Sequence, residues 1–192
     1  MLRADQLSRD RACVLVIDVQ EKLIPLIRGH ERVVRGGRKL LDGARVFGLP
    51  LLVTEQYPKG LGPTVLEIRE AWGDGGADVL EKPTFSAWAH PPVREALLEL
   101  DRPQIIITGI ETHVCVQQTA LDLVSRDYDV FVCADAVGSR GKVDHKQALQ
   151  RLSRGGAAVT TVESVLFELC ERCDTPTFKQ MLEVIKRNPP VD

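Results

Sequence analysis

The sequence predicts an α/β fold: a three-layer α/β/α sandwich around a six-stranded, mostly parallel sheet. Short apolar runs rich in β-branched residues alternate along the chain with longer segments of helical periodicity. Such alternation is typical of a parallel sheet with helices on both faces. The chain has 192 residues, of which 44% are hydrophobic, and this suits one domain with a substantial core. We therefore expect a single domain over residues 1–192.

Six apolar runs are expected to form the strands, in the chain order 13–17, 51–53, 78–80, 104–108, 130–133 and 157–161. The run at 78–80 is the weakest of them. All of the runs are far shorter than the ~20 residues needed to cross a bilayer. They therefore indicate buried strands, and we expect no membrane partner.

Helical periodicity between the strands predicts helices over 32–47, 92–100, 114–125, 143–154 and 164–169. Three of these helices end just before a strand at glycine or proline turns: Gly48-Leu49-Pro50, Asp101-Arg102-Pro103 and Gly155-Gly156. Asp174-Thr175-Pro176 begins a last helix over 177–186 because it supplies a capping side chain and a proline near the first turn. The long irregular segment 55–76 contains a short helical patch around 65–71. Loops of that length are often functional.

Charge and cysteine content exclude several classes of protein. With 25 Lys and Arg against 27 Asp and Glu, the formal net charge is −2, so no basic excess exists to neutralise the phosphates of a nucleic acid. The first residues lack the apolar core of a signal peptide, which favours a cytoplasmic location. The five cysteines, an odd number, disfavour a disulfide framework and predict at least one free thiol; they are residues 13, 115, 133, 170 and 173.

Three expected strand ends carry reactive side chains, and open parallel sheets bind ligands at the carboxyl ends of their strands. Asp18 ends an apolar run, where desolvation would raise the pKa of its carboxyl and make it a usable base; its alternative role is a helix cap. Lys82 leaves a strand end beside a proline, and its alternative role is an ordinary solvated lysine. Asp135, which ends the fifth run, is expected to hold a loop or a cap.

Cys115 is the most informative residue because it is expected in the first turn of the helix after the fourth strand. A helix N-terminus lowers the pKa of a thiol, and its N–H groups can hold the oxyanion of a tetrahedral intermediate. The alternative is a buried small hydrophobic residue. An acid, a cation and a thiol at three strand ends are together the parts of an activated-nucleophile site.

At these residues the sequence resembles the isochorismatase-like hydrolases, a group of cysteine hydrolases with an Asp-Lys-Cys triad. The resemblance covers nearly the whole chain and rests on Val14-Leu15-Val16-Ile17-Asp18-Val19-Gln20, Glu81-Lys82-Pro83-Thr84-Phe85-Ser86, Gly109-Ile110-Glu111-Thr112-His113-Val114-Cys115-Val116 and Gln118-Thr119-Ala120. It implies that Asp18 is the general base, Lys82 the supporting cation and Cys115 the nucleophile. It also implies a cis peptide at Ile110-Glu111, which directs the N–H of Glu111, with that of Cys115, into an oxyanion hole.

One further likeness and two departures from neighbouring groups of the family refine the resemblance. Residues 54–65 look most like the isochorismatase-domain-containing proteins. Nicotinamidases carry an Asp/His metal cluster beginning after the second strand, where this chain reads Thr54-Glu55-Gln56; we expect no catalytic metal and no cofactor. The isochorismatases proper lack the nucleophilic cysteine, so Cys115 favours acyl chemistry over vinyl-ether cleavage.

Several other residues are candidates for a pocket, a metal site or a redox role. Gln20, Tyr57, Phe85 and Trp88 lie in or near strand-end loops and are expected to line a small-molecule pocket. His113 precedes Cys115 by two residues, a spacing that does not place two helical side chains face to face, so it is expected to be a loop or interface histidine. Cys170 and Cys173 have the spacing of a redox or zinc pair without a second pair. Gly36-Gly37, inside a helical pattern, indicates close packing.

Taken together, the residues and the resemblance predict a metal-independent cysteine hydrolase that cleaves a small amide-like C–N carbonyl compound through a thioester. Two alternatives stay open: a vinyl-ether hydrolase that uses Asp18 without a covalent step, and a catalytically silent binding or regulatory subunit. The resemblance further implies a homo-oligomer, a dimer or tetramer, in which a neighbouring subunit closes the pocket.

Overall fold

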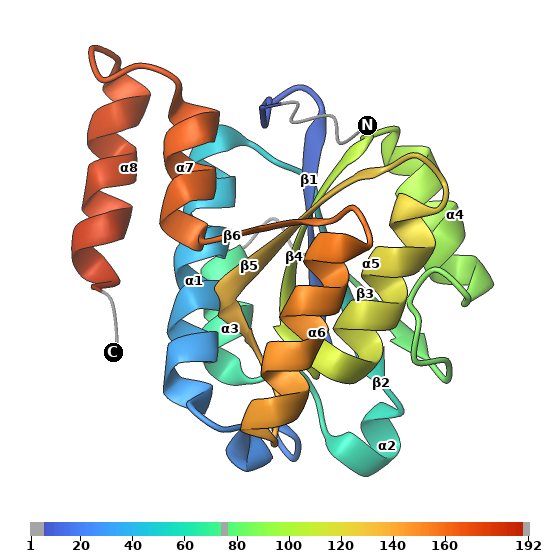
Figure 1. Cartoon of the computed structure of the whole chain (residues 1–192). Helices are drawn as coiled ribbons and strands as arrows, with labels where there is room; N and C mark the ends of the chain where they lie inside the picture. Colours follow the sequence, from blue (N-terminus) through green and yellow to red (C-terminus); the bar gives the residue numbers. More distant parts are fainter. Residues whose placement is uncertain (1–5, 74–76, 190–192) are drawn as a thin grey trace.

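The structure, a computed structural model, describes residues 6–73 and 77–189. One six-stranded sheet with the order β3-β2-β1-β4-β5-β6 forms its centre, and all neighbouring strands are parallel (Figure 1). The strands are β1 (Ala12–Ile17), β2 (Leu51–Gln56), β3 (Asp78–Lys82), β4 (Gln104–Ile110), β5 (Asp129–Gly138) and β6 (Ala158–Thr160). The predicted α/β sandwich with a six-stranded parallel sheet is confirmed.

Helices cover both faces of the sheet (Figure 1). One face carries α1 (His30–Phe47), α3 (Leu66–Trp72) and α7 (Val162–Cys170), with α8 (Pro176–Arg187) against α1 and α7. The other carries α4 (Pro91–Leu100), α5 (Gln117–Val124) and α6 (Lys142–Arg154). Shorter turns are η1 (Ile24–Leu26), α2 (Pro58–Leu61) and the π-helical turn η2 (Thr112–Val116). No helix of the described residues is long and apolar enough to span a membrane.

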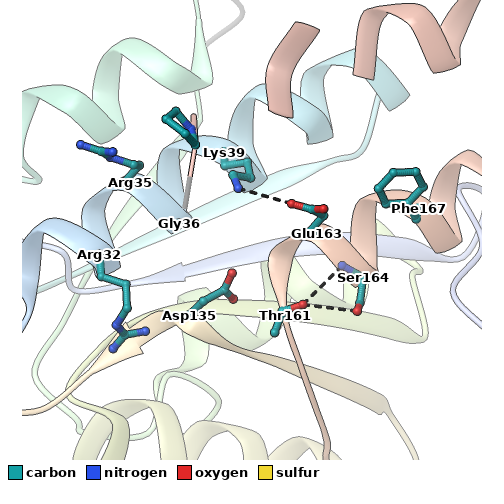
Figure 2. Close-up of a pocket in the computed structure, with 10 residues that line it drawn as sticks. Arg32, Arg35, Gly36, Lys39, Asp135, Thr161, Glu163, Ser164 and Phe167 are labelled. Atoms are coloured by element: carbon teal, nitrogen blue, oxygen red, sulfur yellow. Dashed lines mark hydrogen bonds and ion pairs between the residues drawn. The ribbon is translucent and has the colours of Figure 1, made fainter. Parts of the chain in front are cut away.

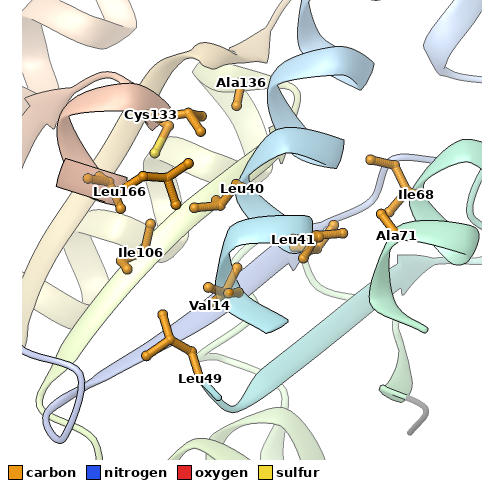
Figure 3. Close-up of a cluster of buried hydrophobic side chains, with 14 of the residues drawn as sticks. Val14, Leu40, Leu41, Leu49, Ile68, Ala71, Ile106, Cys133, Ala136 and Leu166 are labelled. Carbon is orange, nitrogen blue, oxygen red and sulfur yellow. The ribbon is translucent and has the colours of Figure 1, made fainter. Parts of the chain in front are cut away.

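The central strands β1 and β4 are buried on both faces and are mostly apolar. Alternate residues of β1 enter two hydrophobic clusters: Val14 faces α1 and α7, whereas Leu15 faces α4 and α5. Figure 3 shows the first cluster, in which Leu40 of α1 lies toward Leu166 and Ile106, and Leu41 lies toward Ile68 of α3. Each fully buried leucine or isoleucine stabilises the fold by about 1.5–3 kcal/mol. The core therefore holds the end of β1, where Asp18 follows, in a fixed position.

The predicted element boundaries differ from the observed ones mainly at the site. Strands β2, β3 and β4 continue past the predicted apolar runs, since parallel backbone pairing extends to Gln56 opposite Lys82 whatever the polarity of the side chains. The helix expected over 114–125 is divided into η2 and α5. The irregular segment expected over 55–76 begins as strand and contains α2 and α3; residues 74–76 of it lie outside the described residues.

Strand β5 carries a bulge that the sequence did not indicate. Its register against β4 jumps from Ile107↔Val132 to Gly109↔Val137, and the Thr108 hydroxyl donates to the Ala136 carbonyl at 2.7 Å. Asp135 therefore lies within the strand, not after it. Helix α1 crosses this bulge closely, because a Cβ at Gly36 would lie 2.6 Å from the Asp135 carbonyl oxygen. The close packing predicted at Gly36 is confirmed.

The described cysteines are all free thiols, four of them buried and Cys173 exposed. The prediction of at least one free thiol is thus confirmed. Cys170 donates to the Arg172 carbonyl at 3.4 Å, within its own turn. Among residues 6–73 and 77–189, no group of three or more His, Cys, Asp or Glu side chains is placed to hold a metal ion.

Candidate active site

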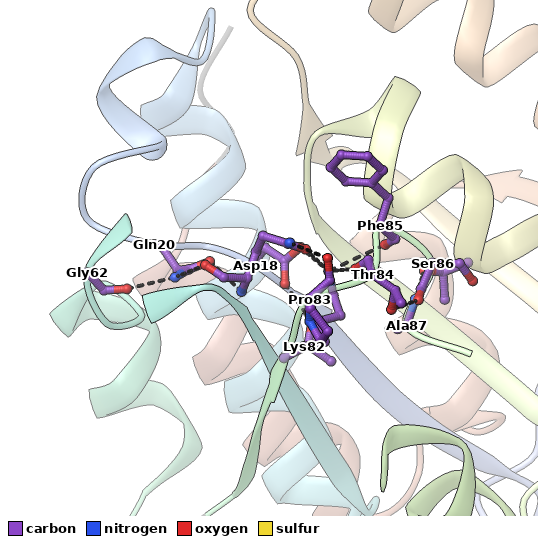
Figure 4. Close-up of polar contacts among 12 residues, drawn as sticks. Asp18, Gln20, Gly62, Lys82, Pro83, Thr84, Phe85, Ser86 and Ala87 are labelled. Atoms are coloured by element: carbon purple, nitrogen blue, oxygen red, sulfur yellow. Dashed lines mark hydrogen bonds and ion pairs between the residues drawn. The ribbon is translucent and has the colours of Figure 1, made fainter. Parts of the chain in front are cut away.

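Asp18 and Lys82 form a buried ion pair at the carboxyl edge of the sheet (Figure 4). Asp18 follows β1 directly and has a left-handed backbone, with φ 53°, a conformation that aspartate tolerates better than most side chains. Its Oδ2 accepts a hydrogen bond from Lys82 Nζ at 2.7 Å, and its Oδ1 accepts one from the Thr54 hydroxyl at 2.8 Å. Both oxygens are engaged, which fixes the orientation of the carboxylate.

Lys82, at the end of β3, is enclosed by acceptors. Besides Asp18, its Nζ donates to Gln56 Oε1 at 2.7 Å and lies 3.1 and 3.4 Å from the carbonyl oxygens of Thr84 and Phe85. A buried ammonium needs such partners because desolvation strongly disfavours an isolated charge. The alternative of an ordinary solvated lysine is therefore wrong. Sequence reasoning assigned no role to Gln56. The parallel register of β2 and β3 places Gln56 beside Lys82, and knowledge of this register would have been needed to predict the contact.

Cys115 lies in η2, buried next to the ion pair and interacting with both of its members. Burial, and after it the Asp18 carboxylate, raise the pKa of its thiol to about 12, while Lys82 opposes part of this rise. The sequence-based expectation of a lowered thiol pKa is wrong, because desolvation and the adjacent carboxylate outweigh the helix N-terminus. Cys115 is held as a neutral thiol.

Burial also raises the pKa of the Asp18 carboxyl, as predicted from the sequence. The charge of Lys82 and hydrogen bonds from Lys82, Cys115 and Thr54 oppose this rise. A carboxylate whose proton affinity is raised, in hydrogen-bonding contact with a thiol, is suited to accept the thiol proton.

The turn that carries Cys115 is tied to the segment after β5. The Ile110–Glu111 peptide bond is cis, and the Glu111 carbonyl accepts the N–H groups of Val114 and Val116 at 3.0 and 3.2 Å. The Glu111 carboxylate accepts the N–H and the Nε–H of Arg140 at 3.0 and 3.1 Å. These contacts hold the backbone on both sides of Cys115.

Two histidines near this turn contact hydroxyl groups instead of the thiol. His113 Nδ1 lies 3.0 Å from Ser139 Oγ, and His145 Nδ1 lies 3.0 Å from Thr112 Oγ1. His113 thus lies in the turn η2 and not in a loop, so the prediction of a loop position is wrong, whereas its ring is directed to Ser139 and not to the thiol.

Of the four predicted pocket residues, two lie at the surface near the site. A hollow of about 510 Å³ is lined by Gln56, Tyr57, Glu81, Lys82 and Pro83. Tyr57 is 63% exposed and Phe85 is 56% exposed, so both aromatic rings are accessible at the carboxyl edge of the sheet.

The other two pocket predictions need correction. Gln20 is buried, and its amide donates to the carbonyls of Gln56 and Gly62 at 3.0 and 2.7 Å while accepting the Gln56 N–H at 2.8 Å. Both hydrogen bonds that the Gln20 side chain donates therefore go to backbone carbonyls. Trp88 is 8% exposed and packs edge-on against Tyr128, with ring centroids 5.6 Å apart. It belongs to the core under α4 and α5.

Two other carboxylates near the sheet have structural roles. Glu55 Oε1 accepts the N–H and the hydroxyl of Thr64 at 2.6 and 2.8 Å, which ties β2 to the segment before α3. Asp135 Oδ1 accepts the Val162 N–H at 2.9 Å at the start of α7. Asp135 thus holds a helix start, in agreement with the role predicted for it.

Comparison with known proteins gives matches over most of the chain. Residues 12–164 match the isochorismatase domain. The chain is 41% identical over 174 residues to isochorismatase domain-containing protein 1 of Danio rerio, a match that covers 90% of this chain and 60% of that protein. The chain thus spans about 60% of the length of this relative.

Solved structures agree in fold. A protein of Caenorhabditis elegans described as MAR1 ribonuclease is 34% identical, with a TM-score of 0.89 over 98% of this chain and 99% of its own. The YcaC protein of Escherichia coli, described as an octameric hydrolase of unknown specificity, is 28% identical, with a TM-score of 0.89 over 95% of this chain and 90% of its own.

Proposed function

The chain belongs to the isochorismatase family, and from that premise we propose that it is a metal-independent cysteine hydrolase. The proposed substrate is a small amide-like C–N carbonyl compound, cleaved through a thioester on Cys115. One observation carries the proposal: a thiol interacts with both members of a buried Asp18–Lys82 pair. The pair offers a proton acceptor and a cation to the same sulfur atom.

The first step is the attack of the Cys115 sulfur on the substrate carbonyl. Because burial and the adjacent Asp18 carboxylate raise the thiol pKa well above neutral pH, a free thiolate is disfavoured before the attack. We therefore place the transfer of the thiol proton to Asp18 in concert with formation of the C–S bond. Protonation neutralises the carboxylate, and the charge of Lys82, 2.7 Å from Asp18 Oδ2, becomes available to the developing negative charge.

The remaining steps return the site to its starting state. The N–H groups of Glu111 and Cys115 are proposed to hold the oxyanion of the tetrahedral intermediate. The C–N bond then breaks, and Asp18 passes its proton to the leaving nitrogen. A water molecule gives a proton to Asp18 and attacks the thioester carbonyl. The C–S bond breaks, and the Asp18 proton returns to the sulfur, releasing the carboxylic acid product.

Access to the site favours a small substrate. The reacting side chains are buried, and the adjoining hollow of about 510 Å³ lies within the ~300–1,000 Å³ typical of small-molecule pockets. Tyr57 lines this hollow, and we propose that Phe85, exposed nearby, adds an apolar group at the entrance to the site. We also propose that residues 1–192 form a single domain.

The experiment is a turnover assay with a panel of small amides, combined with mass spectrometry of the peptide that contains Cys115. Cys115→Ala and Asp18→Asn are each expected to lower kcat at least about 1,000-fold while circular dichroism stays that of the wild type. The matched control is Cys173→Ala, which removes an exposed thiol away from the sheet edge and leaves turnover unchanged. An acyl adduct is expected on Cys115.

The same variants distinguish the alternatives. A vinyl-ether hydrolase that uses Asp18 as an acid would keep its activity in Cys115→Ala and lose it in Asp18→Asn. A silent binding subunit would give neither turnover nor adduct. The ribonuclease description of the Caenorhabditis elegans protein is tested by adding an RNA oligonucleotide to the panel.

A further inference from the structure

A second pocket lies between α1 and the start of α7, on the sheet face that carries α1 and α3 (Figure 2). Its volume is about 600 Å³, again within the range of small-molecule sites. Its lining includes Arg32, Arg35, Lys39, Asp135, Glu163 and Phe167. None of these residues belongs to the proposed catalytic set, so this pocket needs its own explanation.

Lys39 is the feature of this pocket that points to a ligand. The residue is only 5% exposed, and the nearest carboxylate oxygen to its Nζ, Glu163 Oε2, is 3.8 Å away. This separation exceeds hydrogen-bond distance. Within the described residues the Lys39 ammonium donates no hydrogen bond. The stem of Lys39 is buried and its ammonium opens into the pocket, where Figure 2 shows the nitrogen directed toward Glu163.

Two more cations lie on the same face of α1, at helical spacing from Lys39. Arg32 is half-buried and donates to the carbonyls of Ala134 and Val137 at 2.7 and 3.1 Å, so the bulge of β5 holds its guanidinium in place. Arg35 is exposed at the rim. The wall formed by α1 is therefore positively charged from the rim to the interior.

The two carboxylates of the pocket do not cancel this charge. Asp135 lies beside Arg32 and is occupied by the Val162 N–H. Glu163 has a side chain that is 48% exposed, so it is solvated and free to turn away. At the start of α7, Thr161 Oγ1 already accepts the Ser164 N–H at 3.4 Å. The pocket cations that donate no hydrogen bond to another described residue, and so can turn to an anion, are thus Lys39 and Arg35.

We propose that this pocket binds a small molecule bearing an oxyanion group, a phosphate or a carboxylate, against Lys39. The anion completes the hydrogen bonds of the ammonium and displaces the distant Glu163 carboxylate, while Arg35 approaches it from the rim. The ring of Phe167, which is 45% exposed, lies beside the organic part of the ligand.

The test is isothermal titration of the full chain with phenyl phosphate, benzoate and inorganic phosphate. Saturable binding of at least one probe is expected, and Lys39→Met is expected to weaken it at least about tenfold, the effect of one charge-assisted hydrogen bond. Methionine keeps the buried stem packed. The matched control is Arg38→Met, which removes the same charge from the same helix but faces Glu70, 3.6 Å away; it should change the affinity less than twofold.

A second variant separates a ligand site from a merely structural ion pair. Glu163→Gln removes the competing carboxylate, so it should tighten probe binding at least about threefold. The proposal is overturned if no probe binds, if Arg38→Met weakens binding as much as Lys39→Met, or if Glu163→Gln leaves the affinity unchanged. Because the readout is binding and not turnover, these outcomes are independent of the function proposed for Cys115.

Discussion

Cys115 is held as a thiol by its immediate surroundings. Desolvation and the Asp18 carboxylate raise its pKa to about 12, and Lys82 offsets only part of this rise. At rest, the negative charge of the site therefore belongs to Asp18, whose partner is Lys82. The sulfur becomes nucleophilic when its proton moves, which suits an enzyme that must not react with other electrophiles before its substrate is bound.

This protonation state predicts the pH dependence of alkylation. Iodoacetamide modification of Cys115 should accelerate about tenfold per pH unit between pH 7 and 9, without a plateau, because the thiolate fraction rises in that proportion below the pKa. Asp18→Asn removes a charge that raises the thiol pKa, so more thiolate exists at each pH and alkylation should be faster, although turnover is lost. The rates are read by peptide mass spectrometry. A plateau below pH 8 in the wild type would contradict the assignment.

The Asp18–Lys82 pair predicts a characteristic pattern of stabilities. Lys82→Met leaves the Asp18 carboxylate buried without its cation, which should lower the free energy of unfolding by about 3–5 kcal/mol. Adding Asp18→Asn to the same chain removes the orphan charge and should restore most of that loss. The two single variants and the double variant are compared by urea unfolding. Additive losses in the double variant would show that the two groups do not depend on each other.

At the scale of elements, the close approach of β4 to β1 aligns the site. Gly109 has φ +130°, and a Cβ there would lie 2.1 Å from the Ile17 carbonyl oxygen, directly before Asp18. The same strand leads into the turn that holds Cys115. Glycine at position 109 therefore allows the side chains of Asp18, after β1, and Cys115, after β4, to meet.

Gly109→Ala should consequently destabilise the fold by at least about 3 kcal/mol, because the backbone of β1 must shift in addition to the strain of positive φ. The matched control is Gly48→Ala: Gly48 also has positive φ, +66°, but nothing lies within 4 Å of the position that a Cβ would occupy there. Gly48→Ala should lower the free energy of unfolding by roughly 1–2 kcal/mol, which is the cost of the conformational strain alone. Thermal unfolding of the two variants measures the difference. Equal losses would contradict the steric argument.

How far the sequence predicts each element depends on what stabilises it. Apolar periodicity predicted the six strands and the main helices, since burial drives their formation. It did not predict the extension of β2 to Gln56 or the bulge around Asp135, because both depend on backbone pairing between distant segments. The contacts of Gln20 and Trp88 were missed for a similar reason: a loop position does not reveal which neighbours satisfy a side chain.

At the scale of the whole molecule, the sheet separates two chemically different sites. The proposed catalytic residues lie at or after the ends of β1, β3 and β4, whereas the cationic pocket lies between α1 and α7. Arg32 links the two regions: its charge helps to lower the pKa of His145, after burial as the larger cause, and His145 contacts Thr112 in the turn of Cys115. Both sites thus border the segment from β5 to α6.

The exposed aromatic rings beside the site bear on the assembly of the protein. Tyr57 and Phe85 are large apolar side chains left in solvent, and accessible apolar groups at the edge of a pocket mark interaction surfaces. With a chain mass of 21.3 kDa, sedimentation velocity should give a multiple of that mass. Phe85→Ser should weaken the assembly, whereas Leu98→Ser, an exposed apolar position on α4, should not. A wild-type monomer would contradict the predicted homo-oligomer, and equal effects of the two variants would move the interface away from the pocket.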